Sequence, residues 1–268
     1  MKQMRKFVVF ILAVTLVFAA MPIAQVQAAS KKNVYVITKV KVKQDGESTT
    51  TKLAYNKTGL LKTITDPRED LTETFKYNSK GQLTEYKETI KSGDHKGNNT
   101  TRKYTWKNGL LTIITWSGSD GSKDKYELKY KNKKLNKVLV TSTWTNDNGK
   151  KETDTRDKKI TLNKKGHISK IEEANITEMG TFDKNGNVTK WSAVYDGNEV
   201  GYVKTTYTYK NGRVIKLKRE SYNPMMNNPL KETWTITYSK KSVDKKYVSY
   251  IAEQQWKFLN GNVENYAW

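Results

Sequence analysis

Few residues in the chain have the types and spacing that metal chemistry needs. The 268 residues include two histidines, His95 and His167, and no cysteine. His95 lies in a polar stretch and His167 directly follows a turn glycine, so the pair lacks the spacing of a zinc site, and no thiolate is available to join it. The sequence therefore predicts no zinc site, and we expect no other metal and no cofactor.

One further pattern imitates the start of a calcium-binding loop. Asp183, Asn185 and Asn187 match the first oxygen ligands of such a loop, which requires Gly at its sixth position and Glu at its twelfth. Val188 and Val194 occupy those two positions here. We interpret the segment as a hairpin turn.

Enzymatic chemistry would require a nucleophile with a base, or two opposed carboxylates. The carboxylates lie in segments of mixed charge, where a solvated role is the ordinary one: Glu69, Asp70, Glu152, Asp154, Glu172 and Glu173. We predict no catalytic residue. A polysaccharide-acting enzyme such as a lyase, with His167 beside a tyrosine as its first candidate, is the least favoured function.

Aromatic side chains are the remaining candidates for a site. The chain has seven Trp, 16 Tyr and six Phe, and rows of Tyr and Trp can stack on sugars or line an apolar cavity. The simpler interpretation is that they form cross-strand pairs in a β-sheet core, and we favour it for any single residue. The candidate ligand-binding residues are Tyr104, Trp106, Tyr207, Tyr209 and Trp234.

The amino-terminal residues predict a secretory signal peptide. Three basic residues precede an apolar run of 14 residues, which is shorter than a membrane-spanning helix, and small residues follow. Cleavage is expected between Ala28 and Ala29. The predicted organisation is a signal peptide over residues 1–28 and a single β-repeat domain over 29–268, exported from the cell and without a membrane span in its mature form.

Lysine dominates the charge of the chain. The formal net charge is +22, and the three basic residues of the signal peptide reduce it to +19 in the mature protein. A field of that sign attracts polyanions. Only six of the 49 basic residues are Arg, the side chain that contacts phosphates and bases in bidentate fashion, so we expect no nucleic-acid partner. Lysines along strands also serve to keep outer faces soluble.

A short phrase recurs along the chain and predicts the fold. It consists of an anchor, a glycine position three or four residues later, an apolar residue two beyond the glycine and another five beyond it. The eight anchors are Tyr55, Tyr77, Trp106, Tyr130, Leu162, Phe182, Tyr209 and Tyr238, and the glycine positions are Gly59, Gly81, Gly109, Lys133, Gly166, Gly186, Gly212 and Lys241. A unit repeated at irregular spacing with a constant core is typical of a repeated supersecondary structure.

Each unit is predicted to be a β-hairpin. Asn-Gly pairs at 108–109, 185–186, 211–212 and 260–261 are suited to tight turns with positive φ. The two apolar residues after each turn are three positions apart, so either a β-bulge restores their phase or both faces are covered. Because Lys strains a left-handed backbone, we expect the turns at Lys133 and Lys241 to be of another type.

The predicted fold is all-β. We expect a long antiparallel meander of about 17 strands from residue 34 to the end, without helical periodicity, curled into a soluble barrel, half-barrel or rolled sheet. The aromatic face is expected inside. The opposite face is rich in Thr and Lys, as in KTTYTYK (204–210), which is too polar for the lipid-facing band of an outer-membrane barrel.

The phrases YNKTGLLKTI (55–64), YNSKGQLTEY (77–86), FDKNGNVTKW (182–191) and YKNGRVIKL (209–217) resemble the tyrosine-aspartate repeats of bacterial RHS-type proteins. The Asp of that repeat is present only as Asp183 and the Arg only as Arg213. The length, signal peptide and single meander also resemble a secreted bacterial family of unknown function with a porin-like β-barrel fold. Both resemblances imply an architecture, and neither supplies catalytic residues.

These observations predict a secreted, non-catalytic β-repeat scaffold or surface-binding protein. It would associate with an anionic cell-wall polymer or glycan through its Lys-rich face. The alternative is a carrier that holds a lipid or other apolar ligand in an aromatic-lined barrel.

Overall fold

A computed structural model describes residues 31–68, 70–93, 96–225 and 228–261. The predicted signal peptide, with its cleavage site at Ala28 and Ala29, lies outside the described residues, as does His95.

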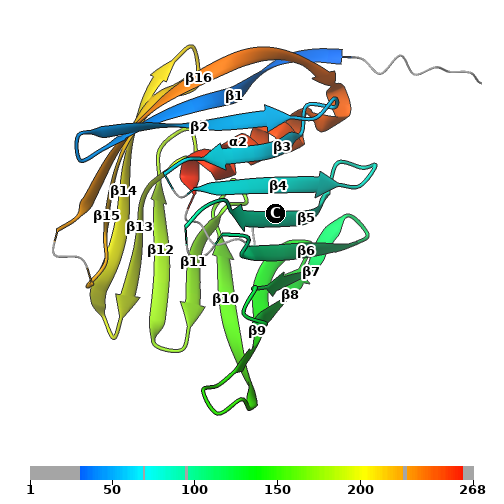
Figure 1. The fold of residues 1–268 in the computed structure, drawn as a ribbon, viewed down its shortest axis with the longest axis vertical. Helices are drawn as coiled ribbons and strands as arrows, with labels where there is room; N and C mark the ends of the chain where they lie inside the picture. Colours follow the sequence, from blue (N-terminus) through cyan, green and yellow to red (C-terminus); the bar gives the residue numbers. More distant parts are fainter. Residues whose placement is uncertain (1–30, 69, 94–95, 226–227, 262–268) are drawn as a thin grey trace, which may run out of the picture.

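Within these residues, sixteen antiparallel strands form one closed barrel (Figure 1). Each strand pairs with the next along the chain, and the last pairs with the first. The strands are β1 (Lys31–Gln44), β2 (Glu47–Tyr55), β3 (Leu61–Asp66), β4 (Leu71–Tyr77), β5 (Leu83–Ile90), β6 (Asn99–Lys107), β7 (Leu110–Ser117), β8 (Lys123–Lys131), β9 (Lys134–Thr145), β10 (Lys151–Leu162), β11 (Ile168–Glu173), β12 (Ile176–Phe182), β13 (Val188–Tyr195), β14 (Asn198–Lys210), β15 (Arg213–Tyr222) and β16 (Leu230–Asp244). Of the three predicted shapes the barrel is confirmed, with sixteen strands in place of about 17.

The hairpins of the repeat end in two kinds of turn. Asn108-Gly109 and Asn211-Gly212 have positive φ at both residues, as predicted. Other units use a longer loop in which an Asn or Asp after the anchor caps the turn. In the loop at Asn78, for example, the Oδ1 atom accepts hydrogen bonds from the N–H groups of Lys80 and Gln82. That side-chain cap is the physical reason for the recurring Asn or Asp.

A β-bulge lies beside the hairpin turn of each of the first seven repeat units. Tyr77 pairs with Leu83, but Lys76 pairs with Glu85, so Thr84 is the extra residue. The bulge turns the two apolar positions of the unit, Leu83 and Tyr86, to the same interior face. The first of the two sequence-based alternatives is therefore confirmed.

The aromatic anchors tie each unit to the one before it. The Tyr77 hydroxyl donates to the carbonyl oxygen of Leu61 at 2.7 Å, and Trp106 Nε1 donates to that of Leu83 at 2.7 Å. Further bonds of this kind join Tyr130 to Leu111 and Tyr238 to Val214. A ring that is apolar on its faces and polar at its tip fills the wall and satisfies a carbonyl group beside a bulge.

The eighth unit is completed by barrel closure instead of a turn. Tyr238 pairs with Ile37, a bulge follows at Thr38, and Val40 is the next buried residue. Strand β1 thus supplies the second half of the unit that begins on β16, and Tyr55 donates to the Ile37 carbonyl oxygen at 2.6 Å, as Tyr77 does to that of Leu61. The prediction of a turn at Lys241 was wrong, because β16 continues through that residue.

Three other turn predictions need correction. Lys133 does adopt a left-handed backbone, with φ of 59° after Asn132 at 51°, so its turn resembles the Asn-Gly turns. Asn185-Gly186 is not a two-residue tip, because only Gly186 has positive φ and Asp183 caps a longer loop. Asn260-Gly261 ends a helix.

That helix, α2 (Val248–Asn260), contradicts the prediction that strands continue to the end of the chain. A short 3₁₀ helix, η1 (Lys245–Tyr247), leads from β16 into it. Figure 1 shows α2 running inside the barrel, close to β3 and β4. Its first turn packs on the β2–β3 loop, where Gly59 leaves room for Val243 and Ile251.

Amide side chains of α2 bond to the barrel backbone. Gln255 Oε1 accepts the Ile37 N–H, Gln254 Oε1 accepts the Leu61 N–H, and Asn260 Oδ1 accepts the Val188 N–H. The helix contacts wall on several sides, and its apolar residues Val248, Ile251 and Leu259 recur at helical spacing, a periodicity that the sequence-based prediction missed. Among the described residues, no helix has the length and apolar character needed to span a membrane.

Candidate functional site

The inward face of the wall changes character along the barrel. Toward the hairpin turns of the repeat it is apolar and packed against α2, whereas farther along the same strands the inward positions become charged. Residues directly opposite each other in antiparallel strands share a face, which places Glu73 beside Glu88, and Arg219 beside Glu232. The lumen therefore contains a group of charged side chains beyond the apolar part, which we call the charged ring: Asp66, Arg68, Glu73, Glu88, Arg102, Arg219 and Glu232.

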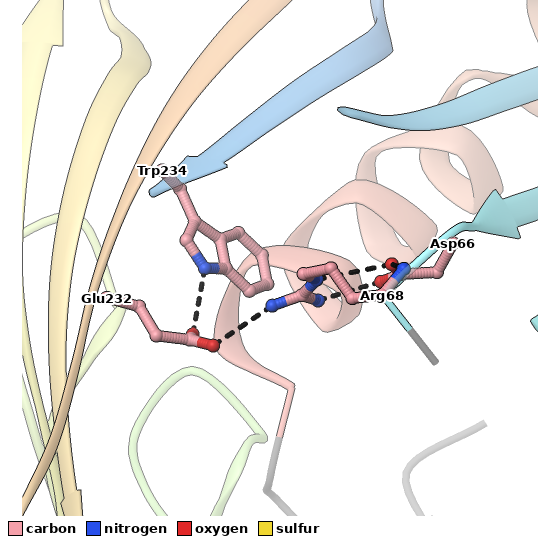
Figure 2. A network of polar contacts seen from close by, with 4 residues as sticks. All are labelled: Asp66, Arg68, Glu232 and Trp234. Atoms are coloured by element: carbon pink, nitrogen blue, oxygen red, sulfur yellow. Dashed lines mark hydrogen bonds and ion pairs between the residues drawn. The ribbon is translucent and has the colours of Figure 1, made fainter. Parts of the chain in front are cut away.

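Arg68 is the centre of an ion-pair network in this ring (Figure 2). Its guanidinium bonds to Asp66 at 2.7 Å and to Glu232 at 3.0 Å, and the Trp234 indole N–H donates to Glu232 at 2.9 Å. Burial raises the pKa of Asp66, but hydrogen bonds and charge from Arg68 outweigh this effect and hold that pKa below its usual value. The network thus joins the end of β3, at Asp66, to β16, at Glu232.

Arg219 is placed differently. Its guanidinium donates to the Leu259 carbonyl oxygen at 3.2 Å and lies 4.5 Å from the centre of the Trp234 ring. No carboxylate of the described residues lies within 4.0 Å of it, and its Nε atom is buried without a hydrogen-bond partner. Burial lowers the pKa of Arg219, since it disfavours the charged form.

Glu73 is a buried carboxyl group in the same ring. Burial raises its pKa to about 7, and the charge of Glu88 acts in the same direction. The group is therefore partly protonated at neutral pH.

A cavity of about 560 Å³ lies between this ring and the end of α2. The volume is within the range of small-molecule sites, roughly 300–1,000 Å³. Its lining combines apolar and aromatic side chains with charged ones, among them Val42, Phe75, Tyr86, Trp234 and Phe258, together with Asp66, Arg68, Glu73, Arg102, Arg219 and Lys257. The arrangement can accept an amphiphilic molecule.

A second cavity of about 500 Å³ lies on the turn side of α2 and includes His167. The imidazole of His167 stacks on Trp256, with ring centres 3.9 Å apart. Its pKa is lowered because burial disfavours the cation. Lys257 lines this cavity as well, and burial lowers its pKa to about 8 despite Glu253 at 3.5 Å.

The five aromatic residues predicted from sequence do not converge on one site. Tyr104 is in the core, and Trp106 lines the second cavity. Tyr207 donates to the Val188 carbonyl oxygen and to Asn260, while the neighbouring Tyr209 bonds to the turn of the preceding unit at Asp183 and Asn187. Trp234 alone of the five lines the charged cavity. Their role in ligand binding stays a prediction.

The calcium-like segment uses its oxygens within the turn. Asp183 Oδ1 accepts the N–H groups of Asn185 and Asn187, which confirms the interpretation as a hairpin turn. Across the described part of the chain, no three His, Asp or Glu side chains are grouped so that they could hold a metal ion.

The outer face carries lysines in two distinct arrangements. The first is a sector on β15, β16, β1 and β2 that we call the lysine–threonine patch. It consists of Lys39, Lys41, Lys43, Lys52, Lys216 and Lys218, with Thr50, Thr233, Thr235 and Thr237 between them. None of these six lysines has a carboxylate of the described residues within 4.0 Å, and all except the half-buried Lys216 are exposed.

The spacing within the patch is regular. Lys41 and Lys216 both face Thr235 from opposite sides, and Lys43 and Lys218 both face Thr233. Two strand spacings separate the lysines across the sheet, about 10 Å, and two residues separate them along β1, about 7 Å.

The second arrangement, which we call the paired sector, lies on β8 to β11. Several of its lysines have a carboxylate within 4.0 Å. Lys125 and Lys129 bond to Glu127 at 2.5 and 2.9 Å, and Lys137 bonds to Asp157 at 2.6 Å. The hydrogen bonds from Lys125 and Lys129 lower the pKa of Glu127 to about 2.

Comparisons with known proteins find only distant structural likeness. No protein-family model matches the chain, and no curated protein is significantly similar to it. A porin-like protein from Bacteroides vulgatus aligns with 77% of this chain and 99% of its own, at 13% identity and a TM-score of 0.39. Another from Bacteroides uniformis aligns with 76% of this chain and 96% of its own, at 14% identity and a TM-score of 0.36. Likeness at this level carries no argument about function, and the resemblance to tyrosine-aspartate repeats stays a prediction.

Proposed function

We propose that the protein is a secreted, non-catalytic barrel that binds an anionic cell-wall polymer or glycan through the lysine–threonine patch. The observation that carries the proposal is the patch itself. Its six lysines lie on β15, β1 and β2, and the strand between β15 and β1, β16, places only threonines opposite the lysines of those two strands. On β2, Thr50 and Ser48 lie opposite Lys41 and Lys43.

An uncompensated array of ammonium groups is unfavourable for an isolated protein, because like charges repel at distances near the Debye length of about 8–10 Å. The paired sector shows that the same chain places carboxylates among its lysines elsewhere. A linear polymer with a negative charge every few ångströms would neutralise several patch lysines at once and release the counterions that they hold.

The types of cation also favour a cell-wall polymer or glycan over a nucleic acid as the partner. The arginines at 68, 102 and 219 line the luminal cavity, where no duplex could reach them. The outer face is left with lysines, which contact anions as point charges without bidentate geometry.

The test compares two variants of equal net charge. One replaces the six patch lysines with Gln, and the control replaces six ion-paired lysines with Gln: Lys125, Lys129, Lys137, Lys159, Lys170 and Lys190. Binding to polyphosphate and to polygalacturonate is measured between about 50 and 500 mM salt, and the two polymers distinguish phosphate from carboxylate partners.

We expect the patch variant to lose at least tenfold in affinity and most of its salt dependence, whereas the control keeps both within about threefold. Equal losses in the two variants would show that only net charge matters. Absence of binding by the wild-type protein at 50 mM salt would remove the proposal.

The luminal cavity favours a second function, the carriage of a small ligand. It lies inside the barrel, has an apolar and aromatic side at Phe75, Trp234 and Phe258, and is bounded by α2. Native mass spectrometry of the protein purified from its own cells tests this candidate. Carriage predicts a bound mass that is released on denaturation, and repeatedly empty protein would count against it.

A further inference from the structure

We propose that the luminal cavity is a binding site for an organic anion, an amphiphile whose oxyanion pairs with Arg219 while its apolar part lies against Trp234 and Phe258. The inference rests on the carrier function and adds to it the chemical class of the ligand and the residue that selects it.

Arg219 lacks an ion pair with the carboxylate that lies opposite it in the sheet. Glu232 lies directly opposite in the register of β15 and β16 and would be the natural partner. That carboxylate is instead engaged by Arg68 at 3.0 Å and by the Trp234 indole N–H at 2.9 Å. Figure 2 shows Glu232 between these two side chains.

The end of α2 gives Arg219 only part of a counter-charge. The Leu259 carbonyl group belongs to the last turn of the helix, where the dipole amounts to roughly half an elementary negative charge. A largely buried cation without a full anionic partner is costly, and proteins ordinarily pair such a group. A bound oxyanion would complete the pairing and could accept from Nε, the guanidinium donor for which the described residues offer no partner.

Two other cations of the cavity already have carboxylate partners. Arg68 already has two carboxylates, and Lys257 has Glu253 at 3.5 Å. Glu73 would repel an anion only while ionised, and burial raises its pKa to about 7. The lining beside Arg219 is apolar and aromatic, through Val42, Trp234 and Phe258, so the remainder of the ligand should be apolar.

The experiment compares three probes of equal chain length by titration calorimetry: decanoate, decanol and decylammonium, each below its aggregation threshold. The proposal predicts that the wild-type protein binds decanoate at least tenfold more tightly than decanol, and decylammonium most weakly. In R219M this preference disappears, while decanol still binds.

Two controls keep the result interpretable. R156Q removes another arginine, which is ion-paired to Asp154 at 3.1 Å and Glu173 at 3.3 Å, and should leave the decanoate preference unchanged. Without ligand, R219M should unfold at a higher urea concentration than wild type, because it removes an unpaired buried charge. A lower midpoint would identify Arg219 as part of a structural pair and overturn the proposal.

The chain offers one carboxylate of its own just beyond Gly261, at Glu264. E264Q should bind decanoate as wild type does, and a tenfold gain in affinity would assign Arg219 to that internal partner instead. Equal binding of decanoate and decanol would overturn the anion site and leave the carrier function standing. Absence of binding by all three probes would remove both.

Discussion

The two faces of the barrel wall use different cations. Arginines at 68, 102 and 219 line the luminal cavity, in contact with carboxylates, aromatic rings or the helix end. On the outer face of the same strands the cation is lysine, exposed and flanked by threonine in the patch. Arg keeps its charge when buried and bonds in a fixed plane, whereas Lys is a hydrated point charge on a flexible stem.

Most of the positive net charge of the chain therefore comes from lysines on the outer surface. In the lumen, the ion pairs of Arg68 with Asp66 and Glu232 offset part of the positive charge. Most of the lysines are displayed to solvent, where their field extends to molecules outside the protein.

The largest expected effect comes from breaking the luminal network. R68M leaves Asp66 and Glu232 without their cation in a half-buried site, and we expect it to lower the free energy of unfolding by about 3–5 kcal/mol. Urea denaturation followed by tryptophan fluorescence measures the change. The triple variant D66N/R68M/E232Q removes all three charges and should recover most of the loss. If R68M alone cost less than about 1 kcal/mol, the inner face would behave like the outer one.

The next effect concerns pH and the buried carboxyl group Glu73. Its folded pKa of about 7 lies above the unfolded value of 4.5, so the folded state binds more protons between these values. Stability should therefore fall as pH rises from about 4.5 to 7, by roughly 3 kcal/mol at most. E73Q removes this contribution, so that its stability relative to wild type increases across the same interval. Parallel urea midpoints for the two proteins at pH 5 and pH 8 would contradict the assignment.

A smaller effect is expected from the bonds that link successive units. Y130F removes only the hydroxyl that donates to the Leu111 carbonyl oxygen, and leaves that acceptor without its partner. We expect a loss of about 1 kcal/mol in the free energy of unfolding. The matched control is Y195F. Tyr195 is exposed and is not an anchor of the repeat, so this substitution should be neutral. Equal effects would mean that the anchors act by packing alone.

The smallest effects should appear on the outer face. K41Q/K43Q thins the uncompensated patch and should raise the unfolding midpoint slightly at low salt, with no difference at 1 M salt. K137Q in the paired sector loses an exposed bond to Asp157 and should lower stability by less than about 1 kcal/mol. A destabilising effect of K41Q/K43Q at low salt would show that the patch contains an ion pair.

Much of the wall could be predicted from the sequence, because its rules are local. The Asn-Gly tips, the three-residue spacing after each turn and the aromatic anchors each depend on residues within one hairpin. Even the anchor without a turn, Tyr238, signalled a real unit. Its second strand could not be found nearby, since closure supplies it from β1, some 200 residues earlier in the chain.

The interior was less predictable, because it depends on tertiary contacts. The segment of α2 does carry apolar residues at helical spacing, but no side chain caps the start of the helix, so the usual signal of a helix beginning is missing. Arg219 and Glu232 are ordinary strand residues in the sequence, and only the register of β15 and β16 brings them together. The scarcity of arginine was visible from the start, but the placement of Arg68, Arg102 and Arg219 around one cavity required the structure.

The most direct measurement of the central claim is lysine footprinting with an acetylating reagent, with and without polyphosphate at 50 mM salt, read by mass spectrometry. The patch predicts that Lys39, Lys41, Lys43, Lys52 and Lys218 lose reactivity at least threefold on polymer binding, while Lys137 and Lys159 of the paired sector do not change. Protection spread evenly over both sectors, or confined to the paired one, would contradict the account.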